Sequence, residues 1–154
     1  MCLSAQVSFA ASVFLVVGGA AITIVAARKN WRYVPMALIP LFAGVQQFME
    51  GNVWLGITGD NPFQVLWAAF GFIFFTWFMW PIWVPFSMYV IEPPEIPRKP
   101  LVLNFALIGP VFGILLYVPH GLHSEMIVVQ INNQSLAYER SMWLGYLMAL
   151  SLKL

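Results

Sequence analysis

The sequence predicts an all-α integral membrane protein, a bundle of four to five transmembrane helices that forms one membrane domain over 1–154. Hydrophobic residues make up 61% of the 154 residues, whereas charged residues make up only 8%. Several charge-poor stretches also approach the roughly 20 residues that a helix needs to cross the hydrocarbon core. A soluble domain carries about 25% charged residues, so this chain cannot cover a water-exposed surface. The absence of a basic stripe also excludes nucleic-acid binding.

The predicted helices comprise four full-length apolar segments and a shorter fifth one. The four segments cover about 5–27, 34–57, 63–91 and 101–118. The fifth, 141–154, would cover about 20 Å of a roughly 30 Å hydrocarbon core, so it predicts a partial span. No basic stretch precedes the first segment, and we therefore expect it to stay in the mature protein and not to be a signal peptide.

The connections between these segments carry turn and strand patterns. Gly-Asp-Asn-Pro at 59–62 is typical of a tight turn. The proline-rich segment 92–97 cannot be helical, so it predicts a stiff linker. Segments 127–131 and 134–138 flank Asn-Asn at 132–133, which predicts a small extracytoplasmic β-hairpin. Two short strands are marginal alone, so we expect them to pack on another part of the protein.

The basic residues predict the orientation of the chain in the membrane. Six of the seven follow the first or third predicted span or stand at the chain end. The positive-inside rule assigns these positions to the cytoplasm, which places the N-terminus outside. The six residues are Arg28, Lys29, Arg32, Arg98, Lys99 and Lys153.

Glu50 is the one charged residue of the second predicted span. Gln46 and Gln47 precede it by four and three positions, and Trp54 follows by four, so one helix face presents amide, carboxyl and indole groups. Asn52 adds a polar group nearby. An ionised carboxylate is costly in lipid, so Glu50 should face protein or water. Two interpretations stay open: a proton-accepting or cation-binding site open to the outside, or a protonated carboxyl that holds helices together.

Ser4, Ser8 and Ser12 form an i, i+4 stripe in the outer half of the first predicted span, and Gly-Gly-Ala-Ala follows at 18–21. Small residues let helices approach closely, so we interpret the stripe as a packing surface. It lies at the depth of Glu50, and we expect the two faces to meet. The hydroxyls and the amides beside Glu50 then make up a polar cluster.

Trp77, Trp80 and Trp83 stand beside Pro81 and Pro85 in the third predicted span. Pro81 cannot donate to the carbonyl of Trp77, and Pro85 cannot donate to that of Pro81, so the helix should bend there. The three indoles are candidates for a cavity that binds a lipid tail, quinone or pigment. The alternative is that they pack and anchor the helix at the membrane interface.

His120 and His123 follow the fourth predicted span, on the side of Glu50. Two imidazoles and a carboxylate are candidate metal ligands, although Pro119 and the glycine between the histidines argue against one helix holding both. The single cysteine, Cys2, excludes an internal disulfide. If the initiator methionine is removed, Cys2 becomes a candidate nucleophile; otherwise it is a small buried residue.

These motifs make the chain resemble an uncharacterised family of bacterial multi-span membrane proteins that open Met-Cys-Phe-Ser-Ala. The resemblance covers about the first hundred residues and implies a bacterial inner-membrane protein with longer relatives, but no activity. It also implies an outer-facing site that includes Cys2 and Glu50. The motifs are Met1–Ala5 (with Leu3 where the family has Phe), Ser8-Phe9, Leu38–Leu41, Gln46-Gln47-x-x-Glu50-Gly51-x-x-Trp54, Trp80-Pro81-x-x-x-Pro85-Phe86 and Glu92-Pro93.

Three functional hypotheses follow from the sequence. The first is a non-catalytic accessory or structural subunit of a larger membrane complex, in contact with lipid and with other subunits or copies of itself. The short length, the aromatic-rich apolar surface and the lack of a dense catalytic pattern favour it. The second is a membrane enzyme or metal-binding protein with an outer-facing site around Glu50. The third is a small transporter or proton path that uses Glu50.

Overall fold

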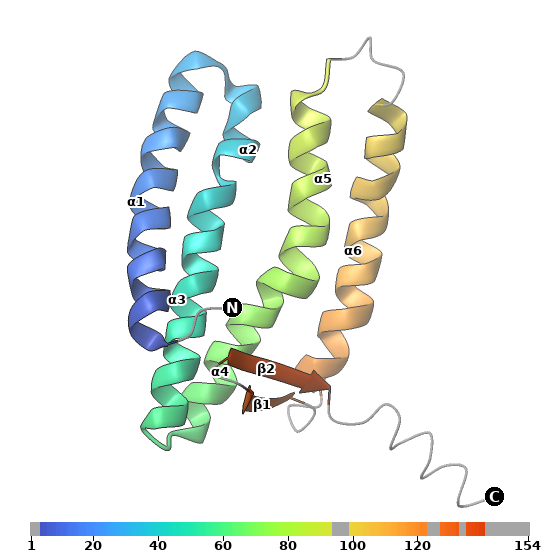
Figure 1. Cartoon of the computed structure of the whole chain (residues 1–154). Coiled ribbons are helices and arrows are strands. Elements are labelled where there is room, and N and C mark those ends of the chain that lie inside the picture. Colours follow the sequence, from blue (N-terminus) through green and yellow to red (C-terminus); the bar gives the residue numbers. More distant parts are fainter. Residues whose placement is uncertain (1–3, 94–98, 123–126, 133–134, 141–154) are drawn as a thin grey trace, which may run out of the picture.

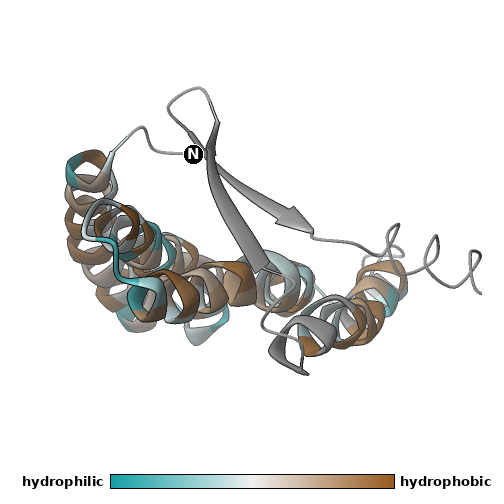
Figure 2. Cartoon of the chain, turned by 90° about the horizontal axis from the view of Figure 1, so that it is seen from below, coloured by the Kyte–Doolittle hydropathy of each residue, from teal (hydrophilic) through white to brown (hydrophobic). Residues whose placement is uncertain are grey.

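The computed structural model describes residues 4–93, 99–122, 127–132 and 135–140. Helices that run up and down stand side by side, and two strands lie at one end (Figure 1). Seen along the helix axes, the helices form a curved row (Figure 2). The elements are α1 (Ala5–Lys29), η1 (Trp31–Tyr33), α2 (Val34–Ala37), α3 (Ile39–Thr58), α4 (Pro62–Ile73), η2 (Phe74–Met79), α5 (Trp80–Ile91), α6 (Lys99–Leu122), β1 (Ile127–Asn132) and β2 (Ser135–Arg140).

Helices α1 and α3 pack closely because glycines stand at their crossing. A Cβ built on Gly44 would lie 2.9 Å from the backbone nitrogen of Val16, and one on Gly51 would lie 2.8 Å from the ring of Phe9. Gly19 meets the backbone of α3 in the same way. Side chains larger than hydrogen would therefore force the two backbones apart. Within the Gly-Gly-Ala-Ala run, Gly19 serves helix packing, whereas a Cβ on Gly18 would meet nothing within 4 Å.

The second predicted span, 34–57, is interrupted at Leu38, where α2 ends and α3 begins. The break is held by polar contacts to both neighbours. The Thr23 hydroxyl of α1 lies 3.1 Å from the Ala37 carbonyl oxygen, and Trp83 Nε1 of α5 donates to the Pro35 carbonyl at 2.9 Å. These contacts tie α2 to α1 and α5.

The third predicted span, 63–91, forms one continuous helix that contains a wide π-helical turn, η2. The Trp80 backbone N–H donates to the Phe75 carbonyl, five residues back, where an α-helix would use the fourth. The wide turn comes just before Pro81, whose ring would crowd the preceding turn of an α-helix. The chain changes direction there (Figure 1), so the expected distortion begins ahead of Pro81.

By length and composition, two of the described helices could cross a membrane: α1 and the continuous helix Pro62–Ile91. A shorter apolar segment of α6 covers Pro100–Leu115. Hydrophobic residues, drawn in brown, make up much of the helices in Figure 2. The most exposed large apolar side chains of α1 and α6 are Val13, Phe14, Val17, Val25, Leu101, Phe105, Leu107 and Leu115.

Strands β1 and β2 pair antiparallel, from Ile127 opposite Arg140 to Asn132 opposite Ser135. The second strand begins one residue later than the sequence pattern predicts and extends further. The strand pair lies near the turn between α3 and α4 (Figure 1). Residues 133–134 between the strands and the predicted partial span 141–154 fall outside the described residues.

Candidate functional site

A polar stripe on α3 forms the centre of the candidate site. Gln46, Glu50 and Trp54 stand at i, i+4 and i+8, so they share one face of the helix. That face turns toward the other helices, because Glu50 is 0% exposed and Trp54 only 7%. The sequence-based expectation that Glu50 faces protein or water therefore fits this position.

The end of this stripe near the α3–α4 turn packs between α1 and α4. Trp54 shares a buried cluster with Ala68 and Ala69 of α4, and Ala5 of α1 packs against that cluster. Ser8 lies one helical turn beyond Ala5 and is 0% exposed. Ser8 is thus buried close to the α1 contact with the Trp54 cluster, and a meeting of the serine stripe with the Glu50 face stays a prediction.

Two polar groups of this region are buried without a hydrogen-bond partner among the described residues. They are the Ser8 hydroxyl and the Trp54 indole N–H. Buried polar groups in folded proteins are nearly always hydrogen-bonded to protein or ordered water. An indole N–H and a hydroxyl that are buried in this way favour a site for water or a small polar ligand.

Gln46 anchors the other end of the stripe to the π-helical turn. Its Nε2 donates to Thr76 Oγ1 at 2.9 Å, and its Oε1 accepts from Trp80 Nε1 at 2.7 Å. The Thr76 hydroxyl in turn reaches the Phe72 carbonyl at 3.3 Å. Both ends of one amide thus join α3 to η2 and α5. The sequence predicted Gln46 beside Glu50 but gave no sign of these distant partners.

The other amides and serines of the predicted polar cluster have different partners from one another. Asn52 donates to the Phe48 carbonyl at 2.8 Å and accepts from Gln64 Nε2 at 3.4 Å, so it links α3 to α4. Gln47 is half-buried. Ser4 caps the start of α1, where its hydroxyl accepts from the backbone at 3.4 Å, and Ser12 is buried at the α1–α3 crossing.

The predicted tryptophan group is distributed along the α5 side of the molecule. Trp80 bonds to Gln46, whereas Trp83 bonds to the α2 backbone and meets Phe42 edge-on at 5.0 Å between ring centroids. Trp77 is half-buried. Two of the three indole N–H groups thus serve contacts between helices. These contacts fit the packing interpretation, and the cofactor interpretation stays a prediction.

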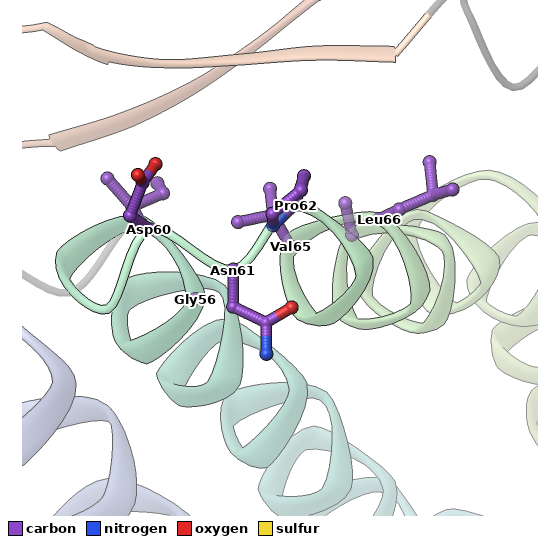
Figure 3. Close-up of a pocket in the computed structure, with 8 residues that line it drawn as sticks. Gly56, Asp60, Asn61, Pro62, Val65 and Leu66 are labelled. Atoms are coloured by element: carbon purple, nitrogen blue, oxygen red, sulfur yellow. The ribbon is translucent and has the colours of Figure 1, made fainter.

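An open cavity of about 400 Å³ lies at the α3–α4 turn. Asp60, Pro62, Val65 and Leu66 point to the side on which the strands run, and Asn61 points away (Figure 3). Asp60 holds a positive φ of 50°, which this tight turn requires. The lining residues are Gly56, Ile57, Asp60, Asn61, Pro62, Val65, Leu66 and Ala69.

The cavity borders the buried cluster around Trp54. Ile57 and Val65 line the cavity and also pack against the cluster, and Ala69 belongs to both. The cavity therefore shares part of its lining with the cluster that contains the indole. Glu50 lies one helical turn beyond Trp54 along α3 and does not line the cavity.

Some of the candidate metal ligands predicted from the sequence lie within the described residues, and others lie outside them. Within the described residues, no three His, Cys, Asp or Glu side chains form a group that could hold a metal ion. His120 belongs to the last turn of α6, at the end of the molecule that also holds the α3–α4 turn (Figure 1). Cys2 and His123 lie outside the described residues, so their predicted roles stay predictions.

Comparison with known proteins identifies a family but no activity. No curated protein and no solved structure shows a significant match to the chain. A family model covers residues 1–152, well beyond the first hundred residues on which the sequence motifs indicated a resemblance. The chain belongs to a family of unknown function, DUF6629.

Proposed function

We propose that this protein is an integral membrane protein in which α1, α3, the continuous α4–α5 helix and α6 all span the bilayer. Exposed apolar side chains on α1 and α6 support this, because apolar side chains are stable against lipid tails and not against water. The end that carries Arg28 and Lys29 faces the cytoplasm, and the strand pair faces outward. A bacterial inner membrane fits this arrangement.

Within that frame, we propose that Glu50 binds and releases a proton at a buried site reached from the outer end. The observation that carries this proposal is the full burial of the Glu50 carboxyl on a polar stripe of α3. Ionisable residues inside membrane helices usually mark proton or ion pathways. The neutral, protonated carboxyl is far cheaper to bury than an ionised one, so proton exchange is the chemistry that this environment favours.

The surroundings of Glu50 supply partners for a water-mediated proton path. The Ser8 hydroxyl can both donate and accept a proton, and the Trp54 N–H is a donor. Neither has a protein partner among the described residues. The cavity at the α3–α4 turn shares Ile57, Val65 and Ala69 with the cluster around Trp54, which supports entry of water from this end.

The test is proton flux through liposomes that contain the purified protein. Glu50→Gln keeps the shape and hydrogen-bonding capacity of the side chain but cannot titrate, so we expect it to abolish flux. Glu92→Gln, a matched carboxyl-to-amide change at the far end of α5 and outside the cavity, should leave most of the flux. Equal flux in the wild type and Glu50→Gln would end the proposal.

A second candidate function is that of an accessory subunit in a larger membrane complex. Its support is the extent of the apolar surface that α1 and α6 leave uncovered, which suits contacts with other membrane helices as well as with lipid. Purification in mild detergent tests it. Foreign subunits in fixed ratio would favour this candidate, whereas a protein that purifies alone and conducts protons would exclude it.

A further inference from the structure

We propose that the loop between α1 and α2 binds the headgroup of an anionic phospholipid. This inference rests on the proposed membrane insertion but not on the role of Glu50. Three cations fall within five residues: Arg28 and Lys29 in the last turn of α1, and Arg32 in η1. Their side chains form no hydrogen bond or ion pair with any residue that the structure describes. Their charges are therefore available to a phosphate group.

Two aromatic side chains accompany these cations. Trp31 is 69% exposed and Tyr33 is 42% exposed, although burying rings of this size is normally favourable. Amphipathic aromatic side chains gather at the membrane interface, where the ring meets the acyl region and the polar atom meets the headgroups. Exposed rings beside three cations indicate a surface that lipid covers.

The loop is held in place by contacts on both of its sides. Asn30 accepts a hydrogen bond from the Arg32 backbone N–H at 3.0 Å, which shapes the turn. Just beyond it, the Thr23 hydroxyl bridges α1 to the Ala37 carbonyl, and Trp83 ties Pro35 to α5. A site built on such a fixed backbone loses less conformational freedom when it binds a ligand.

The neighbouring face of α1 indicates that the anion belongs to a lipid and is not a free phosphate. Ile24 and Val25 precede Arg28 and Lys29 by one helical turn, so an apolar pair lies directly beneath the two cations. Both apolar side chains are more than half exposed. If a lipid phosphate binds these cations, the acyl chains of the same lipid would lie along Ile24 and Val25. Among the residues that the structure describes, the acidic side chain on this side of the molecule is that of Glu92, at the end of α5.

The experiment measures which lipid the purified protein retains. The full chain is reconstituted in phosphatidylcholine vesicles that contain a minority of phosphatidylglycerol, extracted in mild detergent, and analysed by native mass spectrometry. We expect enrichment of phosphatidylglycerol over its share in the vesicle. Arg32→Gln should reduce the enrichment roughly fivefold, the equivalent of ~1 kcal/mol for one cation at a membrane surface. Arg28→Gln, Lys29→Gln and Arg32→Gln together should abolish it.

Arg140→Gln is the matched control, because it removes one cation at the opposite end of the molecule. Unchanged enrichment in that variant supports a local site, whereas an equal loss would overturn it in favour of a general charge effect. Retained enrichment in the triple variant would also overturn it, as would full displacement by inorganic phosphate. Extraction of the protein from vesicles by alkaline carbonate would instead refute the membrane insertion itself.

Discussion

Gly109 of α6 lies directly against the carbonyl oxygen of Pro81 in α5, so closely that a Cβ at this position would overlap the oxygen. One turn away, a Cβ on Gly113 would lie 3.4 Å from the Trp77 carbonyl oxygen. These two carbonyls are the ones to which Pro85 and Pro81 cannot donate. Glycines spaced four apart thus meet carbonyls spaced four apart, a geometry suited to weak Cα–H···O contacts.

Gly109→Ala should destabilise the protein by about 1–3 kcal/mol, because the added methyl collides with backbone that cannot rotate away. The control is Gly18→Ala in α1, where a Cβ would meet nothing within 4 Å. Alanine favours a helix over glycine by up to ~1 kcal/mol, so the control should be neutral or slightly stabilising. Thermal unfolding in detergent gives the comparison, and equal effects of the two substitutions would refute the close packing of α6 on α5.

Gln46 and Trp80 should be energetically coupled. Gln46→Leu removes both bonds of the amide, and Trp80→Phe removes only the N–H that donates at 2.7 Å. In a double-mutant cycle, we expect a coupling energy of roughly 0.6–2 kcal/mol, the range for hydrogen bonds between membrane helices. Additive effects within about 0.3 kcal/mol would mean that the bond does not contribute.

Two buried serines should respond differently to alanine. Ser8 and Ser87 are both 0% exposed. The Ser87 hydroxyl donates to the Trp83 carbonyl at 2.7 Å, whereas the Ser8 hydroxyl has no partner among the described residues. Ser87→Ala should therefore cost about 1 kcal/mol, and Ser8→Ala should cost less or stabilise the fold.

The same pair of variants tests the proton path. Ser8→Ala should slow proton flux because it removes a hydroxyl beside the polar stripe, while Ser87→Ala should leave the flux per folded molecule unchanged. Flux measured at equal protein density, with folding checked by circular dichroism, separates the two effects. An unaltered flux in Ser8→Ala would remove this hydroxyl from the proposed path.

The sequence predicted the helical segments well because apolar length and turn residues act locally. The first and third segments, 5–27 and 63–91, agree with the observed helices to within a few residues at each end. Glu50 could likewise be singled out, since an i, i+4 stripe is visible in the sequence. The break at Leu38 was missed because Pro35 and Pro40 both occupy first-turn positions that a helix tolerates.

The contacts that the sequence could not predict join residues far apart in the chain. Thr76 and Trp80 lie 30 and 34 positions from Gln46, and Gly109 meets Pro81 on another helix. Helical periodicity shows which residues share a face but not which face meets which. The π-helical turn could not be predicted for the same reason. Its Thr76 bonds to Gln46 on another helix, and helical periodicity gives no sign of that partner.

Infrared spectroscopy of the carboxyl region reports the protonation of Glu50, because a protonated Glu absorbs separately from an ionised one. We expect a carboxylic acid band at neutral pH that is missing in Glu50→Gln, and that shifts in D₂O because water reaches the site through the α3–α4 end. A spectrum without that band, or identical spectra for the wild type and Glu50→Gln, would contradict a protonated, exchangeable Glu50.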